Sequence, residues 1–359
     1  MASHALLDLS RQELASRLEE WGEPRFRADQ IWRAVYRELV VSYEAITPLP
    51  RSLRQAMSQR LPFGSLEPLE RVESEDQSTS KVLFRLEDAE TIEAVLMRYE
   101  RRQTVCLSTQ IGCAIGCPFC ATGRGGLRRD LSVGEIVGQV LFFARELARG
   151  GERLTNVVYM GMGEPLLNYD ATIGSIRALN DPDGFGLRAR GFTVSTAGIV
   201  PGIERLAGEE FQVNLAVSLH AANDRLRNQL VPINRRYLLS ELLHACRAYV
   251  ERTHRRISFE IALIDGVNDS LENAREVVAL LDGLLCHVNL IALNPVEGCA
   301  FRPSPRAKRE AFLEELRQRG LEATLRLGRG TEVEAGCGQL RGRQPKASGP
   351  SPGADHTTP

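Results

Sequence analysis

The stretch Val105-Cys-Leu-Ser-Thr-Gln-Ile-Gly-Cys-Ala-Ile-Gly-Cys-Pro-Phe-Cys120 runs from a short apolar segment into a loop with three cysteines. Cys113, Cys117 and Cys120 have the spacing Cys-x3-Cys-x2-Cys. Three thiolates on one loop can hold three irons of a cubane 4Fe-4S cluster and leave the fourth iron open for an exchangeable ligand. The alternative is a zinc knuckle, in which a distant Cys or His completes four protein ligands. An open iron would indicate catalysis, whereas a closed zinc shell would indicate a structural site.

Short apolar runs alternate with helical stretches from residue 104 to about residue 328. Besides the run at 105–108, such runs occupy 157–160, 192–195, 213–219, 257–264 and 288–293. Six successive strand-helix units predict an α/β fold built on a partial parallel (β/α)6 barrel. One helix start is explicit, because Ser132-Val-Gly-Glu135 is a capping box that precedes an apolar helical pattern.

The segments on either side of these units have different patterns. Residues 10–60 carry apolar positions at helical spacing, which Gly22-Glu-Pro24 and Pro48-Leu-Pro50 interrupt, and residues 80–99 alternate like a hairpin. Residues near the C-terminus are rich in Pro, Gly, Ser and Thr, which is typical of disorder. We therefore expect a helical accessory domain (1–75), a β-hairpin extension (76–98), the barrel core (99–331), a mobile loop with a cysteine (332–342) and a disordered tail (343–359).

Composition limits the class of protein without identifying it. The chain has 359 residues, of which 43% are hydrophobic and 25% charged, so it can bury a large core. No stretch approaches the roughly 20 apolar residues of a membrane span, and the first residues lack the pattern of a signal peptide. Eight cysteines, four of them within 15 residues, favour metal or redox chemistry in a reducing compartment. We expect a cytoplasmic monomer that does not associate with membranes.

The cysteine loop, with Phe119 before its last cysteine, resembles that of the radical S-adenosylmethionine (SAM) superfamily. Longer blocks make the chain similar to the RlmN and Cfr group of adenine methyltransferases within that superfamily, from about Glu93 to Leu340. The blocks are Gly161-Met-Gly-Glu-Pro-Leu-Leu-Asn168, Ser218-Leu-His220, Val231-Pro-Ile-Asn234, Asn289-Leu-Ile-Ala-Leu-Asn294 and Ala335-Gly-Cys-Gly-Gln-Leu340. The resemblance implies a radical SAM core with one 4Fe-4S cluster on three cysteines.

Polar residues follow several of the predicted strands. Parallel barrels form their sites at the carboxyl ends of the strands, so these residues are candidate ligands. Within the family they line the SAM site. A carboxylate can neutralise the SAM ammonium, hydroxyls suit its carboxylate or ribose oxygens, and backbone groups suit the adenine edge. The candidates are Glu164 for the ammonium, Ser195 and Ser218 for the oxygens, Leu219 and His220 for the adenine, and also Gly163 and Asn294.

Two solitary cysteines and one glutamate complete the candidate site. From the residues alone, Cys337 between two glycines is a surface thiol or part of a mobile loop, and Cys106 is a buried strand cysteine. Glu93 would be a solvent-facing strand residue. The resemblance implies instead that Cys337 becomes methylated, that Cys106 works with it, and that Glu93 accepts a proton.

The reaction that the resemblance implies methylates carbon 2 of an adenine in 23S ribosomal RNA and, in many members, in transfer RNA. Two SAM molecules are used per turnover. One methylates Cys337, and the other binds the open iron and yields the radical that activates the methyl group. After addition to carbon 2, attack of Cys106 on the Cys337 sulfur releases the product and leaves a disulfide. A low-potential flavodoxin or ferredoxin is the expected electron donor.

Two other functions remain open from the sequence. One is Cfr-like methylation at carbon 8 of the same kind of adenine, and the other is a non-enzymatic metal-containing protein that binds RNA. Arginine clusters such as Arg124, Arg128 and Arg129 would suit phosphate contacts. However, the 45 basic residues include only three lysines, which indicates a coding bias more than selection for RNA. The RNA assignment therefore depends on the resemblance.

Overall fold

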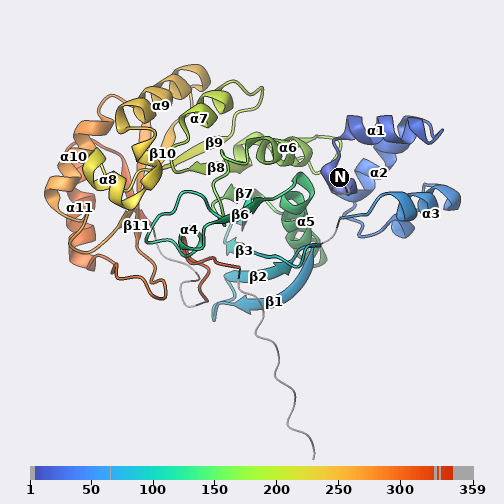
Figure 1. Ribbon diagram of the computed structural model, residues 1–359, viewed down its shortest axis with the longest axis horizontal. Coiled ribbons are helices and arrows are strands. Elements are labelled where there is room, and N and C mark those ends of the chain that lie inside the picture. The colour runs from blue at the N-terminus through green and yellow to red at the C-terminus, as the bar shows by residue number, and fades with distance from the viewer. Residues whose placement is uncertain (1–4, 65, 327–329, 331–332, 343–359) are drawn as a thin grey trace, which may run out of the picture.

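The computed structural model describes residues 5–64, 66–326, 330 and 333–342. The predicted tail, 343–359, lies outside the described residues. The described chain consists of a group of N-terminal helices and a large curved sheet with helices around it (Figure 1). None of the described helices is both long enough and apolar enough to cross a membrane.

The N-terminal helices lie at one end of the molecule (Figure 1) and pack around apolar side chains. Most apolar positions at helical spacing are buried, among them Leu14, Leu18, Ile31 and Val35, while Trp21 and Leu39 are partly buried. The interruptions also lie where expected, because Gly22 has a positive φ of 80° and Pro50 is an N-cap. The elements are η1 (Leu6–Asp8), α1 (Arg11–Glu20), α2 (Phe26–Tyr36), η2 (Tyr43–Ala45) and α3 (Arg51–Arg60).

One sheet of ten strands forms the centre of the molecule, in the order β1-β2-β3-β4-β7-β8-β9-β10-β11-β12. The strands β1 to β4 are antiparallel to one another, and β4 to β12 are parallel in this order. The sheet is not closed. Its strands are β1 (Glu67–Glu73), β2 (Thr79–Arg85), β3 (Thr91–Tyr99), β4 (Arg102–Cys106), β7 (Asn156–Tyr159), β8 (Phe192–Thr196), β9 (Asn214–Ser218), β10 (Ile257–Leu263), β11 (Cys286–Ala292) and β12 (Ala323–Arg326).

The predicted partial barrel is confirmed, because all six apolar runs form parallel strands with helical crossovers. The predicted hairpin is also present as β2 and β3, and it continues the main sheet through β4. Two strands of this ten-stranded sheet have no counterpart in the sequence prediction. The edge strand β1 consists largely of charged residues and has a proline, and β12 is only four residues long, so neither has a clear strand pattern.

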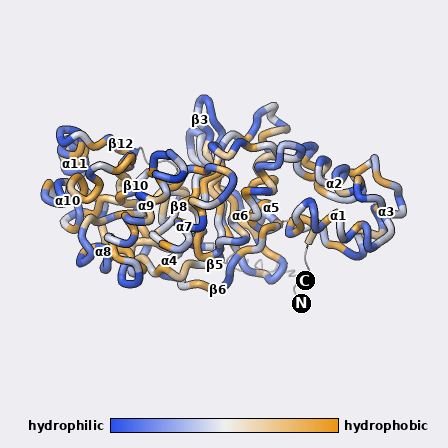
Figure 2. The backbone as a smooth tube through the Cα atoms, turned by 90° about the horizontal axis from the view of Figure 1, so that it is seen from above, coloured by the Kyte–Doolittle hydropathy of each residue, from blue (hydrophilic) through white to orange (hydrophobic). Residues whose placement is uncertain are grey.

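The larger helices of the core lie on the outer side of the curved sheet (Figure 1). Hydrophobic and hydrophilic residues alternate along the chain in these helices (Figure 2), as expected for helices with one buried face. The predicted capping box of α5 is confirmed, because the Glu135 amide donates to Ser132 Oγ over 3.2 Å and the Ser132 amide donates to Glu135 Oε2 over 2.9 Å. The larger helices are α5 (Val133–Arg149), α6 (Tyr169–Asn180), α7 (Val200–Ala207), α8 (Asp224–Leu230), α9 (Leu239–Thr253), α10 (Leu271–Leu281) and α11 (Arg306–Gln318), and the short ones are α4 (Ala121–Arg124), η3 (Ala189–Gly191) and η4 (Pro232–Arg235).

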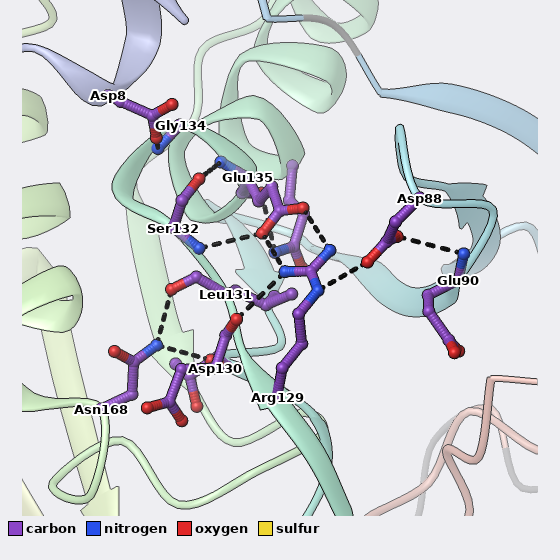
Figure 3. A network of polar contacts seen from close by, with 12 residues as sticks. Asp8, Asp88, Glu90, Arg129, Asp130, Leu131, Ser132, Gly134, Glu135 and Asn168 are labelled. Carbon is purple, nitrogen blue, oxygen red and sulfur yellow. Dashed lines mark hydrogen bonds and ion pairs between the residues drawn. The ribbon is translucent and has the colours of Figure 1, made fainter. Parts of the chain in front are cut away.

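A small antiparallel pair, β5 (Gln110–Gly112) and β6 (Leu127–Asp130), holds both ends of the loop with the three cysteines. Figure 3 shows how polar contacts fix the base of this pair. Arg129 forms two 2.8 Å hydrogen bonds with Glu135 and one of 2.7 Å with Asp88 of the β2-β3 turn. Asp8 accepts a 2.8 Å hydrogen bond from the Gly134 amide. The cysteine loop is thereby tied to α5, to the hairpin and to the N-terminal helices.

Candidate active site

A cavity opens at the carboxyl ends of the parallel strands and contains about 1070 Å³ of space that no atom occupies, its open mouth included. The cysteine loop, the strand ends and the C-terminal segment around Cys337 form its walls. Three predicted site residues, Leu219, Cys106 and Glu93, are not among its lining residues. The predicted residues that line it are Cys113, Cys117, Cys120, Gly163, Glu164, Ser195, Ser218, His220, Asn294 and Cys337.

The backbone of the cysteine loop turns tightly. The Cys113 amide donates to the Gly126 carbonyl over 3.0 Å, and the Cys120 amide donates to the Cys117 carbonyl over 3.1 Å. Gly112 has φ +75°, and a Cβ added there would lie 1.8 Å from the Gly126 oxygen. Only glycine can therefore close this loop and direct its three thiols to one cavity.

The donor set fits a 4Fe-4S cluster better than a single ion. Among the residues with described positions, no three His, Cys, Asp or Glu side chains are grouped closely enough to hold one metal ion. A cubane instead needs three separate anchors around a larger group. Burial raises the pKa of Cys113 to about 12 and raises that of Cys117 well above its usual value. These thiols therefore require a bound cationic group before they can lose their protons.

Glu164 is buried after β7, where protein amides hold its carboxylate. Oε2 accepts a 2.6 Å hydrogen bond from the Ala197 amide, and Oε1 accepts one of 3.0 Å from the Leu166 amide. Burial raises its pKa to about 7, although these hydrogen bonds act in the opposite direction. A buried carboxylate with this pKa is suited to pair with a ligand ammonium, whose charge would restore the ionised form.

The backbone groups of Leu219 and His220, which follow β9, form hydrogen bonds with other groups of the protein. The Leu219 amide donates to the Glu260 carbonyl over 3.0 Å, and the Leu219 carbonyl accepts from Arg227 over 3.1 Å. The His220 carbonyl accepts a 2.7 Å hydrogen bond from Asn268. Leu219 is fully buried and does not reach the cavity.

The ring of His220 has a defined position. Its Nδ1 accepts a 3.1 Å hydrogen bond from the Ala262 amide, and the ring packs against Phe119 with centroids 4.9 Å apart. Burial lowers its pKa to about 3, so the imidazole is neutral. His220 has φ 58°, a left-handed conformation that turns the chain away at the end of β9.

Cys337 lies on a C-terminal segment, 334–342, that is anchored over the cavity. Its carbonyl accepts a 3.0 Å hydrogen bond from Asn294, and the Gly338 carbonyl accepts one of 2.8 Å from the Ala121 amide beside the cysteine loop. A Cβ on Gly336 would lie 2.5 Å from the Asn294 amide nitrogen. The glycine beside Cys337 thus permits close approach to the strand end.

A second cavity of about 1080 Å³ adjoins the first, and Cys337 lines both. Cys106 lines only the second, where burial raises its pKa to about 12. The polar residues of this cavity were not predicted from the sequence. Asn289 donates to Glu260 over 2.8 Å, and Arg326 forms a 3.4 Å ion pair with Glu260. The one available signal was a glutamate inside the apolar run of β10.

Glu93 lies on β3 and is only 5% exposed, so the solvent-facing position expected from the residues alone is wrong. Lys81 on β2 forms a 3.2 Å ion pair with Oε1 of Glu93. Oε2 accepts hydrogen bonds from the amides of Arg341 (2.7 Å) and Gly342 (3.2 Å). The carboxylate is therefore joined to the same segment that carries Cys337.

Comparisons with known proteins agree with this geometry. A family model described as Radical SAM superfamily matches residues 107–278, and one described as Ribosomal RNA large subunit methyltransferase N-terminal domain matches residues 4–62. A Frankia casuarinae protein named probable dual-specificity RNA methyltransferase RlmN is 51% identical over 348 residues, covering 94% of this chain and 83% of the relative. A Moorella thermoacetica protein of the same name is 48% identical over 341 residues, covering 94% and 96%.

The crystal structure of a radical SAM methyltransferase from Sphaerobacter thermophilus has a TM-score of 0.93 and 53% sequence identity, covering 95% of this chain and all of that one. The partial barrel, the three-cysteine loop after its first strand and the cavity at the strand ends define a radical SAM methyltransferase. Similarity to the named relatives extends over nearly the whole chain. The chain therefore belongs to the RlmN family of RNA methyltransferases, as the sequence blocks predicted.

Proposed function

We propose that this enzyme methylates carbon 2 of a specific adenine in 23S ribosomal RNA and in transfer RNA. The names of its relatives include dual-specificity RNA methyltransferase, and its N-terminal helices match a domain of ribosomal RNA large subunit methyltransferases. The observation that carries the proposal is the position of Cys337, which borders both the cavity of the cysteine loop and the cavity of Cys106. The Cys337 thiol can therefore meet reactants that bind in either cavity.

Cys113, Cys117 and Cys120 would hold a 4Fe-4S cluster, which supplies reductive cleavage of SAM when it is bound. Glu164 would neutralise the SAM ammonium. The rest of SAM would be oriented by polar residues that line the same cavity, namely Ser195, Ser218, His220 and Asn294. Gly163 lets the chain pass close to β5, because a Cβ at this position would lie 2.8 Å from the Gln110 backbone nitrogen. Two SAM molecules would be used per turnover.

Cys337 would first accept a methyl group on sulfur and, after activation, join covalently to adenine. Cys106 would then attack the Cys337 sulfur. In this step a sulfur-sulfur bond forms, the carbon-sulfur bond to the adduct breaks, and its electron pair leaves with the methylated base, which takes up a proton. Cys106 is suited to this late step because it lines only the second cavity and not the cavity of the cysteine loop.

Glu93 would accept the carbon-2 proton. In the structure, however, both of its carboxylate oxygens already have partners. Lys81 binds one oxygen, and the amides of Arg341 and Gly342 bind the other. Because Cys337 and these amides belong to one segment, a shift of Cys337 toward its substrate would also release Glu93. The base would thus become available at the time the methyl-carrying thiol moves.

The remaining features of the proposal concern the surroundings of the enzyme. We expect a monomer that acts in the cytoplasm with a low-potential flavodoxin or ferredoxin as electron donor. Mass spectrometry of RNA digests from cells with and without the gene tests the substrate. A methyl group at carbon 2 that depends on the gene supports the proposal, whereas one at carbon 8 or no missing methyl group contradicts it.

The two solitary cysteines can be separated by what each variant leaves behind. Cys337→Ala has no sulfur to methylate and should never join to RNA, although its cluster should assemble. Cys106→Ala should stop after addition and leave a protein-RNA conjugate that survives denaturation. Gel electrophoresis after incubation with SAM, reductant and RNA detects the conjugate. Equal behaviour of the two variants would contradict the proposed division of roles.

A further inference from the structure

Arg227 on α8 is a fully buried cation with an unusual set of partners. It is 0% exposed. Its Nη2 donates to the carbonyls of Ala197 (2.6 Å) and Ser218 (3.0 Å), and its Nε donates to the carbonyl of Leu219 (3.1 Å). Its Nη1 donates to the Asn234 side-chain oxygen over 2.7 Å. All four acceptors are neutral. Ala197 follows β8, Ser218 and Leu219 are at the end of β9, and Asn234 is in η4.

No carboxylate in the described part of the chain forms an ion pair with Arg227. The acid that influences it most is Asp224, which is joined to it only through Asn234, whose amide donates to Asp224 over 2.9 Å. A buried charge without a counter-charge is costly, and desolvation lowers the pKa of Arg227 to about 10. The chain itself therefore leaves this charge largely uncompensated.

The position of Arg227 indicates what compensates it. Two of its acceptors, Ala197 and Ser218, line the active-site cavity together with Cys117. The Arg227 guanidinium therefore binds the backbone of the same cavity wall to which the cysteine loop contributes. The cation thus lies behind the wall against which the cluster would sit.

We propose that Arg227 is the buried counter-charge of the 4Fe-4S cluster and also positions the SAM-binding ends of β8 and β9. A cluster on three thiolates has a net negative charge, which grows on reduction, so a nearby buried cation stabilises the reduced form and raises the reduction potential. The hydrogen bonds to Ala197 and Ser218 hold the two strand ends at the cavity. This inference rests on the proposed function only in that the three-cysteine loop holds the cluster.

Variants separate the charge of Arg227 from its hydrogen bonds. Arg227→Gln removes the charge and should shift the midpoint potential of the reconstituted cluster to a more negative value. Arg227→Lys keeps the charge and should retain most of the potential, but it loses donors to the strand ends and should bind SAM more weakly. Asp224→Asn removes the acid that is linked to Arg227 through Asn234 and should shift the potential in the positive direction. Anaerobic redox titration followed by electron paramagnetic resonance measures each potential.

Arg225→Gln is the matched control, because Arg225 is an exposed arginine on the same helix and loses the same charge. Its potential should equal that of the unmodified enzyme. An unchanged potential in Arg227→Gln, or an equal shift in Arg227→Lys, overturns the proposal. If Arg227→Gln does not retain a cluster, an unchanged potential in Asp224→Asn overturns it. Absence of iron and sulfide from the unmodified reconstituted enzyme would instead contradict the proposed function.

Discussion

At the scale of single residues, burial sets the chemistry of the cavity. Glu164 and His220 are both buried, but burial raises the pKa of the carboxyl to about 7 and lowers that of the imidazole to about 3. Both shifts favour neutral side chains in the free protein. A charged ligand group can reverse this for Glu164, whereas His220 keeps its Nδ1 as an acceptor for the Ala262 amide.

SAM binding should therefore depend on pH through Glu164. Below its pKa of about 7 the side chain is protonated, and a SAM ammonium must first drive off that proton. Affinity should rise by close to tenfold from about pH 6 to about pH 7.5, since the ionised fraction rises by roughly that factor. Equilibrium dialysis of the cluster-loaded enzyme measures this. Glu164→Gln should bind weakly at every pH, and a steep pH dependence in that variant would exclude Glu164 as the titrating group.

Each of the three loop cysteines should be required for the cluster. Cys117→Ala removes one anchor, and the two remaining thiols provide too few bonds to hold a cubane. Iron and sulfide analysis after anaerobic reconstitution should show a loss of most of the cluster. Cys286→Ala on β11 is the control, because that thiol lies outside the cavity and should leave cluster content unchanged. Normal cluster content in Cys117→Ala would refute the assignment of this ligand.

At the scale of elements, the start of α5 joins three parts of the chain. The capping box of Ser132 and Glu135 begins the helix, Arg129 links it to the β2-β3 turn, and Asp8 reaches it from the N-terminal helices (Figure 3). Because β6 leads directly into this helix, the same contacts hold one end of the cysteine loop. The stability of this helix start and the geometry of the cluster site are therefore coupled.

Ser132→Ala should lower the free energy of unfolding by about 1 kcal/mol, because the Glu135 amide loses its acceptor. Urea denaturation followed by circular dichroism measures the change. Ser132→Thr keeps the hydroxyl and serves as the control, with a much smaller expected effect. If both variants lose the same stability, the hydroxyl is not the stabilising group.

At the scale of the whole molecule, the C-terminal segment closes the open side of the site. Its hydrogen bonds extend to β3 at Glu93, to the cysteine loop at Ala121 and to the end of β11 at Asn294. Leu340 on this segment is only 4% exposed. A segment near the end of the chain thus completes a cavity that is formed by elements preceding it in sequence.

Truncation after Gly342 should leave folding and cluster assembly unchanged. The removed residues, 343–359, have too little apolar composition to offset an ordering cost of about 1 to 2 kcal/mol per residue. Truncation after Gln339 is the informative comparison, because it removes the buried Leu340 and the amides that bind Glu93. The protein truncated after Gly342 should have the same thermal unfolding temperature and iron content as the full chain. The protein truncated after Gln339 should have lower values of both. A loss in both truncations would show that residues 343–359 contribute to the fold.

The sequence by itself determined the six parallel strands, the start of α5 and the loop of three cysteines. These features depend on periodicity and spacing within a few residues, so local physical chemistry is enough to predict them. Two strands of the main sheet were not predicted in this way, because the charged edge strand β1 and the short β12 lack a pattern of their own.

Only the tertiary structure decided the burial of Glu93, the second cavity around Cys106 and Cys337, and the environment of Arg227. Glu93 is covered by residues 341 and 342, almost 250 positions away in the chain. Arg227 is buried where carbonyls from the ends of β8 and β9 converge on its guanidinium. Such contacts depend on how distant segments pack, and no local pattern in the sequence encodes them.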